Sequence, residues 1–456
     1  MIRACAAALL AFALARPAAA QPRTMGLMQN DTGAFVGYTL FAPMSYEVTY
    51  LIDNQGRLIH SWPSQYKPGL AAYLLENGDL LRTARLPNAQ FNGGGRGGRL
   101  ERINWDGNLV WAFEYSTDRH VLHHNVAVLP DGHLLAIAWE FKGREEAIAA
   151  GRNPEFLSRD ALWPDHVIEI DPGADSIVWE WHAWDHLIQQ FDSTKQNWGV
   201  VREHPELINI NYHSDTRGTA DWHHCNSVDY NAELDQVMIS CRQFSEIWVI
   251  DHSTTTEQAR GHSGGRHGRG GDLLYRWGHS VAYSHGTEVD RRLFFQHDAR
   301  WIGDSLNGAG HVLVFNNGML AGRHYSTVDE LVLPADSLGS YPLRPDTTWG
   351  PDSTAWSYGG PGGFYADYVS GSQRLPNGNT LVTAGPNGDI FEVTDAGQAV
   401  WRYINPVCDS GPMIQYHTIP LRANEVFKAH RYSPNYPAFT GRTLVPGLPI
   451  ERYPPA

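Results

Sequence analysis

Two adjacent histidines, an asparagine and an arginine lie close together in the segment DWHHCNSVDYNAELDQVMISCRQFSEIWVID. The runs CNSVDY and QVMISCR are typical of β-strands and NAELD of a turn, which predicts a hairpin. Side chains alternate between the two faces of a strand, so a register with Cys225 opposite Cys241 places His224, Asn226 and Arg242 on the other face. An imidazole, an amide and a guanidinium can bind anionic oxygen atoms and supply one nucleophile or acid-base group. The same residues could form an ordinary solvated sheet face, so a functional site needs support from the rest of the chain.

The elements that position these side chains are predicted to be β-strands. The 456 residues include 16 Trp, 20 Tyr, 45 Gly and 27 Pro, with only 18% charged residues, a composition typical of many short strands and turns. Apolar residues at helical spacing are nearly absent, and EFKGREEAIAAGRN is the only segment with helical character. We therefore predict an all-β fold.

A two-part unit recurs six times, with an aspartate-glycine turn, a tryptophan strand and a second turn containing Asn-Gly or Asp-Gly. The first unit pairs LIDNQGRLIHSW with AAYLLENGDLLRTA, and the second pairs LERINWDGNLVWAFEY with HHNVAVLPDGHLLAIA. Two facing β-sandwiches would not explain this repeated order. The pattern predicts a six-bladed β-propeller of four-stranded antiparallel blades over residues 45–435, with an N-terminal extension at 21–44 and a C-terminal tail at 436–456.

Histidines recur at one position of this repeat. Alignment of LPDG in the second unit with IGDS in the fourth places His124 and His297 at equivalent positions. His224 occupies the matching point of the third unit, and His417 lies close to it in the sixth. Because the innermost strands of a propeller line its central channel, we expect these side chains to converge there. Histidines satisfied within a core would be the alternative.

The N-terminus and the charge limit the setting in which this site works. Residues 1–20 contain Arg3, the apolar run ACAAALLAFALA and three alanines before Gln21, which predicts a signal peptide and a periplasmic or secreted protein. No later segment is apolar enough to span a membrane. The net charge of −14 argues against nucleic acid as a partner and leaves Arg242 as the local attraction for an anionic substrate.

Three cysteines remain after the signal peptide, and oxidation is favoured in an export compartment. The hairpin register could join Cys225 to Cys241, although strand pairs often constrain disulfide geometry poorly. Whether the two are bonded stays open.

Two glycine-rich segments lack the context that a function would need. NGGGRGGRL matches a dinucleotide-binding glycine pattern, but no strand, helix and downstream acid surround it. ARGHSGGRHGRGG contains His262 and His267 and could bind metal, yet its spacing has no fixed geometry, and we interpret it as a surface loop.

From residue 37 to residue 432 the chain resembles the bacterial arylsulfotransferases, the cofactor-independent aryl-sulfate sulfotransferases. The resemblance is carried by GYTLFAP with LIDNQGRLIHSW, HHNVAVLPDG, WHHCNSVDYN with SCRQFSEIW, GDLLYRWG, FFQHDARW, VFNNG and SGSQRLPNGNTLVTAGPNGDIFEVT. It implies ping-pong transfer of a sulfuryl group from an aryl sulfate donor to a phenolic acceptor through a sulfated histidine. No cofactor and no metal are implied.

The resemblance also implies roles for the residues found above. In the QHDA segment the family nucleophile corresponds to His297. The expected catalytic residues are His297, His124, His224 and Arg242, and the expected substrate-binding residues are Asn226, Arg242 and His417. A neutral imidazole can attack sulfur and later leave, while an arginine can hold two sulfuryl oxygens. Asn226 and a second histidine can donate to the third oxygen, and the remaining histidine can protonate the departing phenolate.

Two departures from the family pattern are visible. Asn125 stands where the family usually has aspartate, and the chain has little room for the separate N-terminal β-domain of longer members. The resemblance leaves a homodimer open. Competing hypotheses are a metal-dependent propeller enzyme that uses the channel histidines as ligands, which Arg242 disfavours, and a non-catalytic propeller scaffold.

Overall fold

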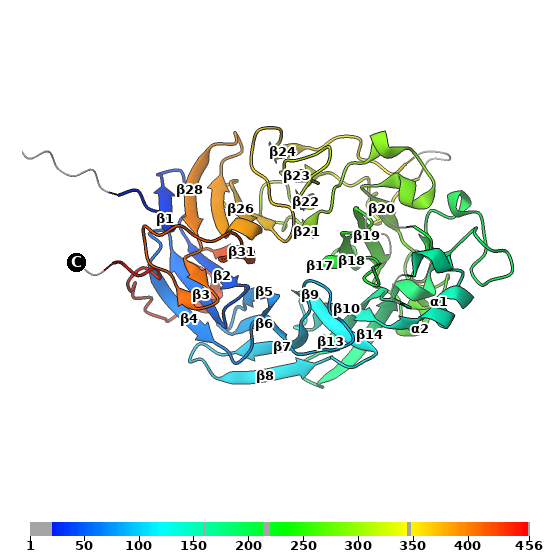
Figure 1. Ribbon diagram of the computed structural model, residues 1–456, viewed down its shortest axis with the longest axis horizontal. Coiled ribbons are helices and arrows are strands. Elements are labelled where there is room, and N and C mark those ends of the chain that lie inside the picture. Colours follow the sequence, from blue (N-terminus) through cyan, green and yellow to red (C-terminus); the bar gives the residue numbers. More distant parts are fainter. Residues whose placement is uncertain (1–20, 158–159, 213–218, 344–347, 455–456) are drawn as a thin grey trace, which may run out of the picture.

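A computed structural model describes residues 21–157, 160–212, 219–343 and 348–454. Six antiparallel sheets surround one centre, and each is built on the same four-stranded plan. This arrangement confirms the predicted six-bladed β-propeller (Figure 1). The predicted signal peptide, residues 1–20, lies outside the described residues. Within the ranges described, no helix has the length and apolar character needed to cross a membrane.

The six sheets share one strand order, written here from the centre outward. They are β31-β2-β3-β4 (Val426–Tyr432, Tyr38–Pro43, Val48–Asp53, Leu58–Pro63), β5-β6-β7-β8 (Pro68–Leu74, Leu80–Arg85, Gly98–Ile103, Leu109–Glu114), β9-β10-β13-β14 (His120–Val128, Leu134–Glu140, Asp165–Asp171, Ser176–His182), β17-β18-β19-β20 (Cys225–Asn231, Gln236–Cys241, Glu246–Asp251, Tyr275–Trp277), β21-β22-β23-β24 (His297–Trp301, Val312–Asn316, Thr327–Leu331, Trp356–Gly359) and β25-β26-β27-β28 (Gly371–Arg374, Thr380–Ala384, Asp389–Val393, Ala399–Ile404).

Both ends of the chain close the ring. The C-terminal strand β31 is the inner strand of the sheet that contains β2 to β4, and the N-terminal strand β1 (Gly26–Asn30) extends the outer edge of the β25–β28 sheet (Figure 1). Residues 21–44, expected as an extension, therefore contribute strands to two blades. The repeat units read from the sequence also straddle neighbouring sheets, because β3 and β4 belong to one blade and β5 and β6 to the next. A repeating sequence does not by itself show where each repeat unit begins. The pairing of the C-terminal strand with β2 determines the boundaries of the blades.

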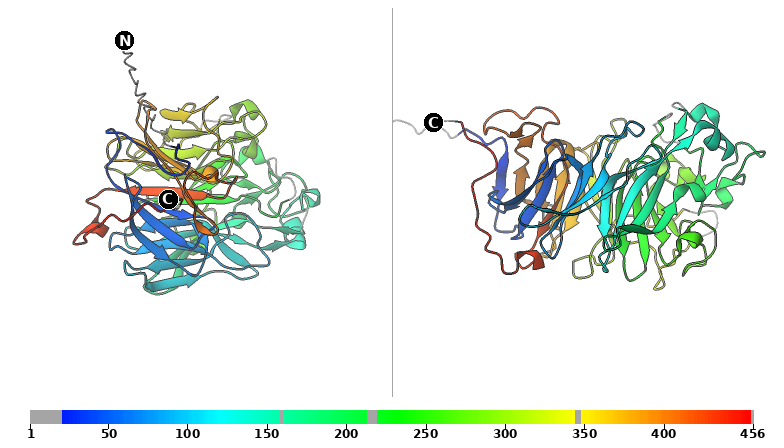
Figure 2. Two further views of the ribbon diagram at one scale, coloured as in Figure 1. Left: turned by 60° about the vertical axis from the view of Figure 1, so that its left-hand side comes forward. Right: turned by 90° about the horizontal axis from the view of Figure 1, so that it is seen from below.

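Short elements connect the blades. Helix α1 (Arg144–Ala149) forms within the one segment predicted to be helical, and α2 (Thr256–Ala259) adds a single turn that the sequence pattern did not predict. Both lie at the end of the ring opposite β1 and the C-terminal tail (Figures 1 and 2). The remaining elements are β11 (Lys142–Gly143), β12 (Ala161–Leu162), β15 (Leu187–Ile188), β16 (Ile208–Asn209), β29 (Val407–Cys408), β30 (Gly411–Pro412), and the 3-10 helices η1 (Pro154–Phe156), η2 (Ala183–Asp185), η3 (Val201–Glu203), η4 (Ser280–Tyr283), η5 (Glu288–Asp290), η6 (Gly385–Asn387) and η7 (Pro437–Phe439).

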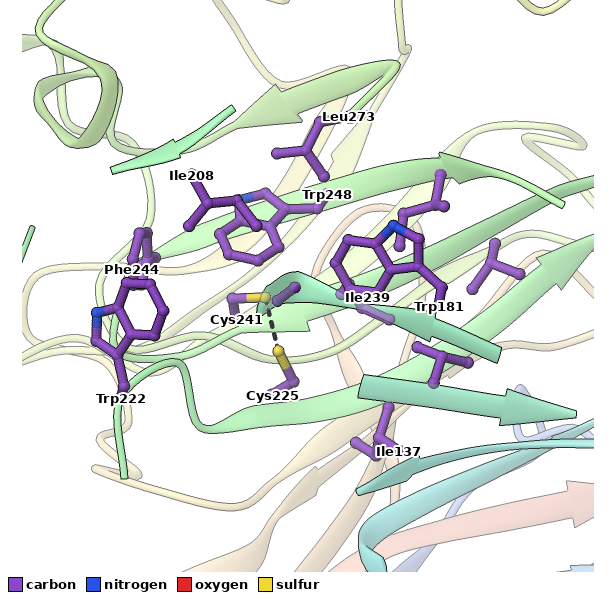
Figure 3. Packing of buried hydrophobic residues seen from close by; sticks show 14 of the residues in the cluster. Ile137, Trp181, Ile208, Trp222, Cys225, Ile239, Cys241, Phe244, Trp248 and Leu273 are labelled. Atoms are coloured by element: carbon purple, nitrogen blue, oxygen red, sulfur yellow. Dashed lines mark hydrogen bonds between the residues drawn. The ribbon is translucent and has the colours of Figure 1, made fainter. Parts of the chain in front are cut away.

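Tryptophans from the strands fill the space between neighbouring sheets. Trp181 on β14 and Trp248 on β19 are fully buried in one cluster with Cys225 and Cys241 (Figure 3). Burying an aromatic side chain removes a large apolar area from water, and truncating one in a core costs about 3–5 kcal/mol. The tryptophans of the repeated strand thus stabilise the packing of each blade on its neighbour.

The hairpin register predicted from the sequence is confirmed. Cys225 of β17 lies directly opposite Cys241 of β18, and the two Sγ atoms are 2.7 Å apart as free thiols. Burial is the main cause that raises the pKa of the Cys241 thiol to about 11. The fold therefore brings the pair together, and their oxidation stays a prediction.

Candidate active site

His124, His224 and His297, here called the channel histidines, all lie on innermost strands or at their first residues. His124 is within β9, His224 immediately precedes β17, and His297 begins β21. These strands surround the centre of the ring (Figure 1). The pairing of each of these inner strands with the next strand contains a register shift, which spans His124 in β9, follows Cys225 in β17 and follows His297 in β21. Such bulges turn side chains out of the alternation of the strand.

The backbone is strained at two of these positions. His124 has a φ of +50° and His224 a φ of +51°, in the left-handed region that side chains with a Cβ rarely adopt. Such a conformation costs on the order of 1–3 kcal/mol and persists where the surrounding structure holds it. The same backbone conformation recurs in neighbouring blades, and both imidazoles point into the same part of the channel.

Ring contacts and charge effects show that the predicted residues converge. The rings of His124 and His224 meet edge to face with centroids 4.7 Å apart. The Phe427 ring lies 6.2 Å from the ring of His124 and 6.4 Å from that of His297. The positive charge of Arg242 acts on both His124 and His297. Four residues from three blades thus share one site.

The hydrogen bonds of His297 determine which of its nitrogens is free. The amide nitrogen of Asn317 donates to the carbonyl oxygens of Ala366 and Val369, at 2.7 and 3.0 Å. Its amide oxygen therefore faces Nδ1 of His297 at 2.7 Å and accepts a hydrogen bond from it. With its proton on Nδ1, a neutral His297 carries its lone pair on Nε2, the arrangement that a nucleophile needs.

His224 and His124 have different partners behind their rings. Nδ1 of His224 lies 2.5 Å from a carboxylate oxygen of Asp221, which can only accept, so His224 donates this bond. Nδ1 of His124 lies 2.9 Å from Nδ1 of His123, and Nε2 of His123 is 2.9 Å from Oδ1 of Asp165. One channel histidine is therefore backed directly by a carboxylate, one through a second histidine, and His297 by an amide.

The electrostatic environment disfavours a charged nucleophile. Burial lowers the pKa of His297 well below 6.5, and the charge of Arg242 lowers it further, although the bond to Asn317 opposes the shift. Burial also lowers the pKa of His124 well below 6.5, with His224 as the next cause. Both rings are consequently neutral near pH 7.

Arg242 supplies a cation at the same place. It directly follows β18, its backbone nitrogen donates to the carbonyl oxygen of His224 at 3.2 Å, and its guanidinium lies 4.8 Å from the centre of the Phe295 ring. Burial lowers the pKa of Arg242, and the charge of Asp221 is the largest effect that opposes the shift. A guanidinium beside a neutral imidazole suits a tetrahedral anion whose centre is attacked by the ring nitrogen.

The profile of the arylsulfotransferase (ASST) family matches residues 38–400. The chain belongs to the arylsulfotransferase family. Membership of this family, together with the propeller fold, supports aryl sulfotransferase activity in general.

Other comparisons give weaker likenesses to this chain. A protein of unknown function from Bacteroides caccae is 10% identical over 87% of this chain and 98% of its own, with a TM-score of 0.46. A putative 6-phosphogluconolactonase from Bacteroides fragilis is 11% identical over 88% and 99%, with a TM-score of 0.40. A streptogramin B lyase is 10% identical over 84% and 85%, with a TM-score of 0.39. No curated protein matches the sequence. At such low TM-scores these likenesses say nothing about activity.

Asn226 contacts the backbone next to His297. Its amide nitrogen donates to the carbonyl oxygen of Gln296 at 2.7 Å, and its amide oxygen accepts from the backbone nitrogen of Asp298 at 3.4 Å. It thus holds the chain on both sides of His297. The predicted contact of Asn226 with substrate stays a prediction, and the clamp on the backbone is the contact that the structure describes.

His417 does not join the other histidines. It lies exposed in the segment between β30 and β31, outside every strand of the sixth sequence unit. The inner strand that follows is β31, which brings Phe427 to the channel histidines instead. The alignment placed His417 wrongly because no aspartate-glycine turn marks the start of β31.

A glycine loop that sequence reasoning set aside covers the site. The carbonyl oxygen of Gly95 accepts from the backbone nitrogen of His124 at 2.8 Å, and a Cβ added to Gly95 would lie 2.0 Å from that imidazole. A Cβ on Gly94 would be 3.8 Å from Cε1 of His224. Glycine is therefore required where the backbone packs against the His124 ring. The run of glycines in the sequence was the signal that could have indicated this close packing against the site.

Two groups of side chains within the described residues have the geometry of a metal site. They are His186, His262 and Asp272, and Asp131, His133 and Glu169, and neither includes a channel histidine. The hypothesis of a metal ion held by the channel histidines gains no support from this geometry.

Proposed function

We propose that this protein transfers a sulfuryl group from an aryl sulfate to a phenol in two steps, through a sulfohistidine on His297 and without a cofactor. The observation that carries the proposal is the bond from Nδ1 of His297 to Asn317, which leaves the lone pair on Nε2. The low pKa of His297 keeps this lone pair available at neutral pH. Arg242 provides the charge that the sulfuryl oxygens need.

In the first step Nε2 of His297 attacks the sulfur atom of the donor. The bond between sulfur and Nε2 forms as the bond between sulfur and the phenolic oxygen breaks, and the electron pair of the broken bond goes to that oxygen. Arg242 holds two sulfuryl oxygens. Nε2 of His124 donates to the third in the form in which His123 donates from both nitrogens, from Nε2 to Asp165 and from Nδ1 to Nδ1 of His124. These contacts strengthen as charge develops on the oxygens.

We assign the proton transfer to His224. Its Nδ1 donates to a carboxylate oxygen of Asp221 at 2.5 Å, a bond that fixes the orientation of the ring. His224 protonates the departing phenolate and is then a neutral base. In the second step it takes the proton of the acceptor phenol, whose oxygen attacks sulfur as the bond to Nε2 breaks. His297 regains its lone pair and the cycle closes.

Aromatic side chains beside the site favour an aryl substrate. Phe427 lies between His124 and His297, and Phe295 lies under Arg242. An aryl ring can stack edge-on or face-on against such side chains with about 0.5–1.5 kcal/mol per pair beyond its area burial. We therefore expect a phenol as both leaving group and acceptor.

We also propose that the protein works in the periplasm or outside the cell, from the apolar segment at residues 1–20. The proposed reaction needs only an aryl sulfate and a phenol, and no nucleotide carrier. A homodimer is compatible with the proposal and is testable by light scattering.

An assay with 4-nitrophenyl sulfate, with and without added phenol, tests the proposed function. We expect a burst of nitrophenolate stoichiometric with enzyme when no acceptor is present, and continuous turnover with phenol. The burst should leave an acid-labile sulfuryl adduct on the peptide that contains His297. An adduct on His124 or His224 would show that the roles are assigned wrongly. Loss of turnover after chelation would favour the metal-dependent enzyme, and no activity at all would favour the scaffold.

A further inference from the structure

A cluster of two histidines and an aspartate lies far from the channel, at the outer ends of two neighbouring blades. Nδ1 of His186 is 2.8 Å from Oδ1 of Asp272, and Nδ1 of His262 is 2.7 Å from the same oxygen. The three atoms lie within 4.8 Å of one another. His186 follows β14 and η2 of one blade, whereas His262 and Asp272 lie between β19 and β20 of the next.

The hydrogen bond on the far side of His186 determines its tautomer. Nε2 of His186 lies 2.8 Å from the carbonyl oxygen of Ala259, and a carbonyl oxygen only accepts, so Nε2 carries a proton. A neutral His186 therefore points the lone pair of Nδ1 at Asp272, whose carboxylate oxygen also offers only lone pairs. Two lone pairs at 2.8 Å require a cation between them, either a proton or a metal ion. A backbone carbonyl that fixes one nitrogen while the other is free is typical of histidines that bind metals.

The second imidazole distinguishes this cluster from an ordinary charge pair. His133 and His252 approach different oxygens of Glu169, at 2.6 and 2.9 Å, so each can share its own proton with its own acceptor. His186 and His262 instead converge on one oxygen of Asp272. Convergence of three donor atoms on one point is what a single ion requires.

We propose that His186, His262 and Asp272 bind one divalent transition-metal ion, with zinc as the fitting ion and water as a fourth ligand. Two imidazole nitrogens and one carboxylate oxygen are donors that zinc accepts in a tetrahedral site. His186 is buried and held by stacking on Trp181, with ring centroids 5.7 Å apart, so its position is set before the ion arrives. The exposed side chain of His262 leaves a path for the ion from solvent.

The ion would join two blades at their outer ends. It links the segment after β14 to the segment before β20, beside the hydrogen bond from the Trp181 indole to the carbonyl oxygen of Gly271. Because binding favours the folded state, zinc should raise the melting temperature without being needed for sulfuryl transfer. The glycine-rich segment with His262, interpreted from sequence as a surface loop, thereby gains a role.

Metal binding by the chelator-stripped protein tests this site directly. After dialysis against Zn²⁺ or Co²⁺, elemental analysis should find one bound ion per chain, and the Co²⁺ form should show the intense visible absorption of tetrahedral coordination. Zinc should also raise the melting temperature. His262→Ala removes an exposed side chain and should abolish the ion, the absorption and the zinc-dependent shift, while the metal-free melting temperature stays unchanged. Asp272→Asn should act in the same direction.

The neighbouring His267→Ala is the matched control and should bind metal as the wild type does. If the wild type binds no ion, or if His262→Ala still binds a full equivalent, the proposal is wrong. If the ion is lost in His133→Ala and kept in His262→Ala, the site is the cluster around Glu169 and the proposal is equally wrong.

Discussion

The channel histidines and the histidines at the rim of the propeller share a side chain but differ in what their ring nitrogens contact. The rim histidines are His133, His252 and His311. His133 and His311 stand at the turns before β10 and β22, and each donates from Nδ1 to a glutamate of the third strand, at 2.6 Å in both cases. Among the channel histidines, His297 has an amide behind its ring and His124 has another histidine.

The contacts explain pKa shifts of opposite direction in the same residue type. Burial alone would lower the pKa of His252, but its hydrogen bonds to Glu169 and Asp235 outweigh burial and raise it. His297 is buried as well, but its hydrogen bond goes to the amide of Asn317, and burial lowers its pKa. A neutral ring with a free lone pair can attack sulfur, whereas a charged ring can hold two strands together. His224 also has a carboxylate behind its ring, that of Asp221, and for this contact we assign the proton transfer to it.

Replacing the nucleophile should produce the largest effect and tests the channel side of the comparison. His297→Asn replaces the imidazole with an amide and removes the attacking nitrogen, so we expect transfer to fall by roughly 10⁴-fold or more and the sulfuryl adduct to disappear. The measurement is kcat with 4-nitrophenyl sulfate and phenol, beside adduct analysis. His417→Asn, an exposed histidine that the structure places away from the site, should keep full activity. Full transfer by His297→Asn would contradict the assignment.

Replacing the proton donor should produce a loss that depends on the leaving group. His224→Asn cannot protonate the phenolate, so kcat/KM should fall by about 10²–10⁴-fold for sulfates of weakly acidic phenols and less for 4-nitrophenyl sulfate. The slope of log(kcat/KM) against the pKa of the leaving phenol should become steeper. A loss of equal size for every leaving group would mean that His224 only shapes the site.

Removing the cation should produce a smaller and uniform loss. Arg242→Met deletes charge-assisted hydrogen bonds, each worth about 1.5–3 kcal/mol, so we expect roughly one to two orders of magnitude in rate. The adduct on His297 should still form, more slowly, because the nucleophile remains. Arg242→Lys keeps the charge without the two-pronged geometry and should recover part of the loss. Equal rates for Arg242→Lys and Arg242→Met would show that charge is not the reason.

Local patterns were sufficient to predict the strands, the six blades and most of the channel residues. His124 and His297 precede readable turns, and the facing cysteines set the register that orients His224 and Arg242. His417 failed because β31 has no such marker. Strand β31 lies near the C-terminus but pairs with β2 near the N-terminus and so completes the first blade. No local sequence pattern encodes this pairing.

The groups that hold the rings of His297 and His124 could not be predicted because Asn317 and Asp165 are distant from them in the sequence. Asn317 lies 20 residues from His297, and the His123 that backs His124 depends on Asp165 of a different strand. Which of these side chains come together depends on how the sheets pack. The periodicity of a single strand carries no information about that packing. The glycines around Gly95 had a signal, but only the fold shows which ring they cover.

The rim should show its role as a pH-dependent contribution to stability, the smallest of the expected effects. The folded-state pKa of His252 is raised above its usual 6.5, so its contribution is fully present below about pH 6.5 and is lost as the pH rises through the folded pKa. The pKa of Glu169 is lowered from 4.5, so its contribution is present above about pH 4.5 and is lost as the pH falls through the folded pKa. The pair should therefore stabilise the fold most between about pH 4.5 and 6.5.

Thermal melting of the wild type and His252→Gln across pH measures this contribution. We expect the variant to melt about 2–4 °C lower near pH 5.5 and the difference to shrink as the pH rises through the folded-state pKa of His252. His417→Gln, with its exposed side chain, should show no such trend. His124 and His297 act in the opposite direction, because their lowered pKa values mean that the unfolded chain takes up protons below pH 6.5 that the two buried rings do not. A wild-type advantage over His252→Gln that grows with pH would therefore mean that His252 is buried as a neutral ring, and the contrast between rim and channel would fail.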